Sequence, residues 1–189
     1  MADTDIDICS RALVLLGEAP ITSFNQNTTA SRTAKLLYEA TVTDLLGGRR
    51  WHFAQTTAQM SRLAAEPVSD WDAEYTRPSG ALVVHRVTID DVPIEFELGE
   101  NTIRCNADET NEVYCTYTVR TLEPYWPPYF RGAVEKELAA RFAFPVTAQE
   151  ALAAKAQTLA DRALRQARLL DSQSQTAPTV RQSRFKSAR

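Results

Sequence analysis

Histidine, methionine, glycine and cysteine are all scarce in this chain of 189 residues. It holds 2 His, 2 Met, 6 Gly and 3 Cys. The scattered glycines form neither the G-x-G-x-x-G nor the G-x-x-x-x-G-K-[ST] pattern, so no phosphate-cradling loop is recognisable. Cys9, Cys105 and Cys115 are odd in number and widely spaced. This spacing predicts reduced cytosolic thiols and no zinc-binding set.

Long apolar runs are missing as well. No stretch approaches the ~20 apolar residues that a membrane-spanning helix needs, so no membrane partner is expected. The segment from Met1 to Asp5 is acidic and has no basic n-region, so we expect no signal peptide. An apolar fraction of 44% and a charged fraction of 24% are typical of a globular protein. The length fits one domain with a small insertion.

Positive charge is concentrated at the C-terminus. The net charge is −3, yet the last ten residues contain no acid and four bases: Arg181, Arg184, Lys186 and Arg189. Residues 1–179 therefore hold 17 basic and 24 acidic side chains, a net charge of −7. Because proteins that grip nucleic acid usually carry a basic face, the acidic body argues against that role.

Two amphipathic helices are expected in the first quarter of the chain. The first, over residues 3–16, has one apolar face made of Ile6, Cys9, Leu13 and Leu16. The second begins after Thr28 or Thr29 and ends at Leu46, before two glycines. Residues 51–54 then look extended, and we expect them to form a first strand beside the helices.

An antiparallel β unit is expected next. Residues 64–80 contain two prolines and little periodicity, which indicates a loop. Alternating apolar and polar residues then predict four strands, over 82–89, 94–98, 102–105 and 113–119. Because the connections are short, consecutive strands should pair as a four-stranded meander.

A second helix pair is expected to follow the strands. Its first helix opens at Pro127-Pro128 and ends at Pro145, and Thr147 with Glu150 fits a capping box for the next. That last helix carries an alanine-rich stripe suited to close packing in a ring: Ala156, Leu159, Ala163 and Ala167.

The expected fold is therefore α+β, a four-helix body with an inserted antiparallel four-stranded β unit and an extended C-terminal tail. Residues 1–63 hold the first helices and first strand, and residues 64–121 the loop and the β unit. Residues 122–171 complete the helical body, and residues 172–189 form the basic tail.

No group of residues predicts catalysis, a metal site or a cofactor. His52 lies between two aromatic residues, which favours a packed histidine over a base. Asp70, Asp72 and Glu74 alternate, but the glycine of a calcium loop is missing, which favours a solvated loop. Glu95 and Glu97 share a strand face, where carboxylates are ordinarily wet, so a hydrolase built on them is the weakest hypothesis.

The basic tail is the most informative segment. Its composition cannot offset the entropy of ordering, so alone it is expected to be disordered. We interpret it as a docking arm that binds a partner through these residues: Val180, Arg181, Arg184, Phe185, Lys186 and Arg189. Two alternatives are a solubilising tail and an accessory module that binds DNA phosphates through this segment.

The order of several motifs resembles the phage head-to-tail adaptor (connector) proteins of the tail tubular protein A family. The opening run of residues 8–23 carries the resemblance, as do residues 51–54 and the series Trp71, Tyr75, Pro78 and Leu82. The resemblance continues in the last third of the chain, over residues 122–124, Phe130, Ala133, residues 138–139 and 142–143, Pro145 and Thr147. Gly48-Arg49-Arg50 departs from the small or proline-bearing turn of the family.

This resemblance implies a non-enzymatic part of a virion neck. Such proteins form a ring of twelve subunits beneath the portal, extend the DNA channel and attach the next tail protein. DNA would pass without sequence-specific binding, which suits an acidic body. The expected location is the virion, with the host cytoplasm during assembly.

The tail hypothesis predicts that Phe185→Ala weakens attachment to a portal ring more than Arg181→Ala does. Ordering a long segment costs ~1–2 kcal/mol per residue, which scattered surface charges cannot offset without a buried anchor. Co-sedimentation with the portal measures attachment, and thermal melting of the free subunit should not change. Full attachment of a chain that ends at Gln175 would contradict the docking arm.

Overall fold

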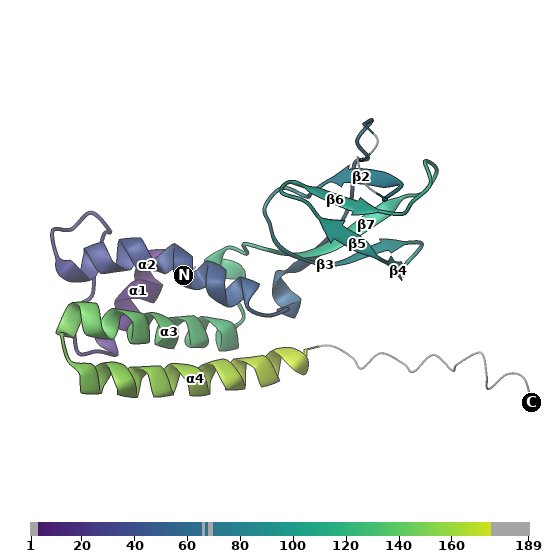
Figure 1. Cartoon of the computed structure of the whole chain (residues 1–189). Coiled ribbons are helices and arrows are strands. Elements are labelled where there is room, and N and C mark those ends of the chain that lie inside the picture. Colours follow the sequence, from purple (N-terminus) through teal and green to yellow (C-terminus); the bar gives the residue numbers. More distant parts are fainter. Residues whose placement is uncertain (1–3, 66, 68–69, 175–189) are drawn as a thin grey trace, which may run out of the picture.

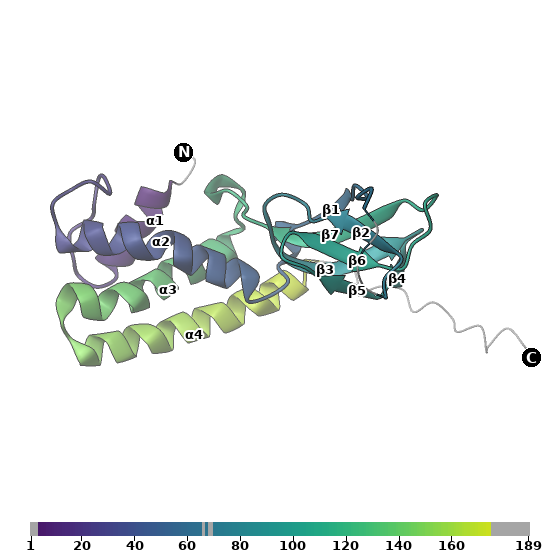
Figure 2. The ribbon, with the colours of Figure 1, turned by 45° about the horizontal axis from the view of Figure 1, so that its top comes forward.

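The computed structural model describes residues 4–65, 67 and 70–174 of the chain (Figure 1). Within these residues there are four α-helices: α1 (Asp5–Val14), α2 (Thr29–Gly47), α3 (Pro128–Thr147) and α4 (Glu150–Ser172). The helices lie at one end of the molecule and the strands at the other, and α4 follows the outer edge of the helical body (Figures 1 and 2). The expected α+β fold is confirmed.

The helical body is built around α3, which contacts the other three helices. Its aromatic centre consists of Trp51, Phe130 and Trp126, all buried, with Phe130 in edge-on contact with both tryptophans at centroid distances of 4.9 and 5.2 Å. The apolar faces predicted for the first two helices also point into this core. Thr4 and Asp7 form a capping box at the start of α1 that the sequence analysis missed.

The β unit has seven strands in the described residues, in two antiparallel sheets. The first sheet has the order β1 (Gln55–Gln59), β7 (Val113–Val119), β3 (Ala81–Ile89), β4 (Val92–Ile94). The second has the order β2 (Ala73–Thr76), β6 (Thr102–Cys105), β5 (Phe96–Leu98). Side chains of both sheets share a core separate from that of the helices, with Ile103, Val87 and Cys115 fully buried.

The predicted meander is wrong in its pairing. β3 does pair with β4 and β5 with β6, but β7 returns to lie between β3 and β1. The strand predicted over 94–98 is interrupted at Glu95, where the chain leaves the first sheet for the second. The short turns correctly predict the pairs of neighbouring strands. The change of sheet depends on burying the inner faces of both sheets against each other, and the residue pattern of one strand does not show which sheet that strand joins.

The first strand was also placed incorrectly. Residues 51–54 are not extended, because His52–Ala54 forms a short 3-10 helix (η1). The strand begins at Gln55 and pairs with β7, so it belongs to the β unit and not to the helical body of residues 1–63. A further strand, β2, lies inside the segment expected to be a loop over residues 64–80.

The last two helix boundaries differ from the prediction. Pro145 lies inside α3, which continues to Thr147 and ends where Ala148 adopts a φ of 52°. Pro145 cannot bond the carbonyl four residues before it, but only two residues of α3 follow it, so the disturbance is confined to the last turn of the helix. The capping box of Thr147 and Glu150 is wrong, because the Thr147 hydroxyl donates to the Ala143 carbonyl instead and Gln149 is the N-cap residue of α4.

Hydrogen bonds and ion pairs around Arg120, which follows β7, connect the β unit to the helices. The Arg120 guanidinium bonds Glu39 at 2.8 and 3.0 Å and Glu123 at 2.6 Å, and Tyr38 donates to Glu123 at 2.9 Å. Burial alone would raise the pKa of Glu123, but the hydrogen bonds from Arg120 and Tyr38 outweigh it and hold that pKa below its ordinary value. Ionised Glu123 therefore stabilises the connection between β7 and α3.

Glu123→Gln should make stability less sensitive to acid. Because the folded-state pKa of Glu123 is depressed, its contribution is present above the unfolded value of ~4.3 and is lost as pH falls through the folded-state value. The stability advantage of the wild type over the variant should shrink as pH is lowered from neutral. Urea unfolding at each pH measures it, and a constant or growing advantage would refute this role.

Candidate functional site

The alanine-rich stripe of α4 faces the interior of the subunit. Ala156 and Ala167 are 8% and 1% exposed and belong to the helical core, and Ala163 packs partly buried against it. These three side chains meet α3, the helix against which α4 packs. Because they are buried inside the subunit, Ala156 and Ala167 do not form the ring-packing surface that the sequence suggested. The spacing of the stripe shows which residues share a helix face, but not what that face packs against. Leu159 is the exception, with an exposed fraction of 47%.

An apolar groove runs between the end of α1 and the first half of α4. It has a volume of about 220 Å³ and is lined by these residues: Leu15, Leu16, Lys136, Ala139, Leu152, Lys155, Ala156 and Leu159. Leu15 is 57% exposed. Exposed leucines gathered in a concave surface, with lysines among them, are typical of a protein-binding site.

Val14 and Leu15 are exposed apolar residues that the sequence did not single out. Both are 57% exposed, although they directly follow the buried residues Ala12 and Leu13 at the end of α1, where Leu15 is the C-cap residue. The available signal was the run from Leu13 to Leu16, in which four consecutive apolar residues exceed the width of one helix face. A run of this kind indicates a second apolar surface beyond the core.

Asp171, at the C-terminal end of α4, holds a buried polar network. Its side chain is completely buried and accepts hydrogen bonds from the His52 backbone N–H at 3.2 Å and the Tyr129 hydroxyl at 2.9 Å. The His52 ring Nδ1 lies 3.1 Å from Oδ2 of Asp171. Burial, followed by the hydrogen bond to Asp171, raises the pKa of Tyr129 to about 12. The network joins α4 to η1 and α3 and fixes the position at which the tail departs.

Both histidines have structural partners. His52 belongs to the Asp171 network, and Nε2 of His85 lies 2.6 Å from the Thr118 hydroxyl. Burial lowers the pKa of His85, and the charge of Arg50 lowers it further. The three cysteines are free and buried, and burial raises the pKa of Cys9 to about 12 and those of Cys105 and Cys115 to about 11. Thiols held protonated in this way are poor nucleophiles.

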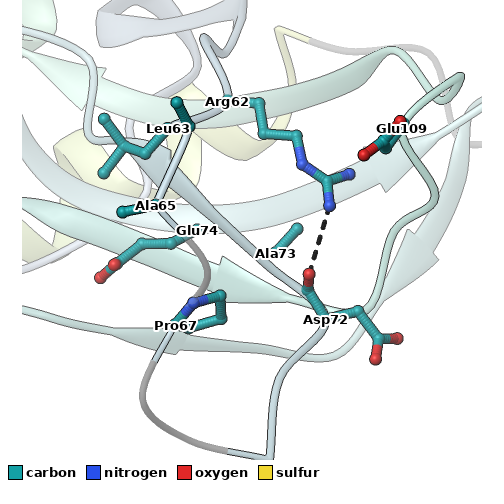
Figure 3. A pocket seen from close by; sticks show the side chains of 9 residues that line it. Arg62, Leu63, Ala65, Pro67, Asp72, Ala73, Glu74 and Glu109 are labelled. Atoms are coloured by element: carbon teal, nitrogen blue, oxygen red, sulfur yellow. Dashed lines mark hydrogen bonds between the residues drawn. The ribbon is translucent and has the colours of Figure 1, made fainter.

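The carboxylates of the acidic segment that could have held a cation do not point toward a common site. Figure 3 shows Asp72 and Glu74 beside a pocket of about 310 Å³ with their carboxylates pointing away from each other. Glu74 is engaged by the Thr102 hydroxyl at 2.5 Å and Arg104 at 3.2 Å, and Arg62 donates to the Asp72 carbonyl at 3.2 Å. Across the described residues, no group of three His, Cys, Asp or Glu side chains could hold a metal ion.

Glu95 and Glu97 do not form a pair either. Glu97 accepts a hydrogen bond from the Trp71 indole at 2.7 Å and lies 3.5 Å from Arg104, whereas Glu95 is exposed at the change of sheet.

The tail residues predicted to dock lie outside the described residues: Val180, Arg181, Arg184, Phe185, Lys186 and Arg189. None of the helices in the described ranges combines the length and apolar character of a membrane span.

The sequence matches no protein-family model, and a search of curated proteins returns no match. The candidate site consists of the apolar groove between α1 and α4, beside the buried network at the end of α4.

Asp171→Ala should destabilise the protein by about 1–3 kcal/mol, because it leaves the His52 N–H and the Tyr129 hydroxyl without their buried acceptor. Urea unfolding measures the loss. Asp161→Ala is the matched control, since Asp161 is an exposed aspartate of the same helix and its removal should change stability by less than ~0.5 kcal/mol. Equal effects of the two substitutions would show that the network does not hold α4.

Proposed function

We propose that this chain is a structural head-to-tail adaptor of a tailed bacteriophage. It forms a ring of twelve subunits beneath the portal, extends the DNA channel and attaches the next tail protein. Its place is the neck of the virion, after assembly in the host cytoplasm. It performs no catalysis in this role and requires no cofactor.

The observation that carries the proposal is the exposed apolar surface of α1 and α4. Leu15 and Leu159 line one groove and are 57% and 47% exposed, whereas the nearby residues Leu13 and Ala156 belong to the core. Gathered apolar surface of this kind is stabilised by a protein partner. We assign the groove between α1 and α4 to the portal, so that the terminal helices face the head.

Two further features support the proposal. The described body is acidic, which suits a conduit through which DNA must slide without sticking. The buried Asp171 network bonds the end of α4 to η1 and α3. A tail that leaves from a fixed point can be presented to the same partner by each subunit of a ring.

DNA binding is the competing function and has its own measurement. Binding of short duplex DNA is compared between the full chain and a chain that ends at Gln175. Binding that needs the tail and weakens steeply with salt would favour the accessory DNA-binding module over the adaptor. The adaptor predicts weak binding that the truncation does not change.

Leu159→Glu should abolish most co-sedimentation with a portal ring, because it places a charge in the apolar groove. Leu36→Glu is the matched control, since Leu36 is 76% exposed on α2 and does not line the groove. Both variants should keep the thermal stability of the wild type within ~0.5 kcal/mol. If Leu159→Glu binds the portal like the control, the groove is not the docking surface.

A further inference from the structure

A second cleft, rich in arginine, lies where the helical body meets the first sheet. It has a volume of about 660 Å³ and is lined by these residues: Arg49, Arg50, His52, Gln55, Thr57, Arg86 and Thr116. No carboxylate is among the lining residues. In a body with a net charge of −7 over residues 1–179, such a cleft is a local reversal of charge.

Local structure explains why two arginines project here from the segment after α2. The indole of the buried Trp51 donates to the Leu45 carbonyl at 2.7 Å, which fixes the chain as it leaves the helix. Arg49 and Arg50 are thereby kept at the surface, with Arg49 6.0 Å from the Trp51 ring. These are the residues that depart from the turn expected in the family.

Arg86 reaches the same cleft because of a β-bulge. The pairing of β3 with β7 shifts between Val84 and Arg86, so His85 is an extra residue in the strand. Val84 and Val87 both face the core of the β unit, and the bulge turns Arg86 outward between them. A regular strand would have placed residue 86 on the same side as residue 84.

The three guanidinium groups have no acidic partner within the described part of the chain. Arg50 bonds the amide oxygen of Gln55 at 3.2 Å, Arg49 bonds the carbonyl of Arg168 at 3.4 Å, and Arg86 makes no hydrogen bond or ion pair there. Cations arranged together without carboxylates are a surface ready to accept an anionic group.

A group of carboxylates lies at the opposite end of the same sheet. Ile89 pairs with both Val92 and Val113, which brings the turn residues Asp90 and Asp91 next to Glu112. The three carboxylates are exposed. The pKa of Tyr114 is raised by its hydrogen bond to Glu112 and by the charges of Glu112, Asp90 and Asp91, as expected for acids that share one neighbourhood. We call Asp90, Asp91 and Glu112 the acidic corner.

We propose that the arginine cleft of one subunit receives the acidic corner of a second copy of this chain. The inference rests on the proposed ring and names one of its subunit contacts. Asp90 lies in the turn that follows β3, four residues after Arg86, a separation of ~13 Å along an extended chain, so a subunit does not fill its own cleft. When two different surfaces of one chain bind each other, every subunit binds one neighbour through its cleft and another through its acidic corner. Such a contact builds a ring where the rotation between neighbours closes, and an open filament where it does not.

A second copy fits the cleft better than DNA does. The body has a net charge of −7 over residues 1–179, which repels a long phosphate backbone more than a compact group of three carboxylates that touches only the cleft. Three arginines of the cleft would face three carboxylates of the acidic corner, and every copy of the chain carries both groups. Because the charges are exposed, the contact should weaken as salt shortens the range of their attraction.

Charge exchange between the two surfaces tests the contact. The cleft variant is Arg50→Glu with Arg86→Glu, which spares Arg49 and its contact with Trp51. The corner variant is Asp90→Asn with Asp91→Gly and Glu112→Lys. Asn and Gly suit the positive φ values of 48° and 63° in that turn. Self-association of the full chain is measured by sedimentation velocity at low and high salt.

The wild type should self-associate, and each variant alone should do so at least tenfold more weakly. An equimolar mixture should recover assembly, because every contact in it pairs opposite charges again. Arg32→Glu with Lys35→Glu is the matched control, since it makes the same change of charge at exposed residues of α2 outside the cleft. Circular dichroism establishes that each variant is folded.

Several results would overturn the inference. A wild type that stays monomeric at its highest soluble concentration would do so, and so would variants that assemble as the wild type does, or a mixture that fails to recover. A cleft variant that assembles normally but loses binding to duplex DNA would assign the cleft to phosphate instead. Variants that assemble normally and still bind the portal would leave the proposed function standing and remove this contact alone.

Discussion

The crossing between helices and strands depends on two buried side chains, Trp51 and Asp171, which meet at the start of η1. Trp51 is fully buried against Phe130 and donates its indole N–H to the end of α2, and the adjoining His52 donates its backbone N–H to the buried carboxylate of Asp171. Tyr129 completes the network from α3. A buried carboxylate is stable only while its donors stay in place, so this junction fixes α2, α3, α4 and the first strand relative to one another.

A fixed junction also holds the surfaces around it in place. The helical and β cores are separate, and the Arg120 cluster supplies a second link between the two units. With both links in place, the apolar groove of α1 and α4 and the arginine cleft are held at set positions on one body. The proposed ring needs both surfaces at the same place on every subunit. Contacts that must form together are lost when their geometry does not allow simultaneous binding.

The sequence predicted those features that local periodicity determines. Both N-terminal helices, their apolar faces and the hairpin of β3 and β4 follow from spacing and turn residues. The return of β7 to β1 and the change of sheet at Glu95 depend on contacts between distant residues, so no local pattern announced them. The same limit applies to the sites: Arg86 enters the cleft through a bulge, and Asp171 is buried by residues more than 40 positions away.

The central claim is that this chain assembles as a ring on a portal. Native mass spectrometry of the full chain mixed with a purified portal ring tests it most directly. The account predicts one dominant particle, whose mass exceeds that of the portal by twelve chains of 21.1 kDa. A mixture in which the portal keeps its own mass and the chain stays monomeric would contradict it.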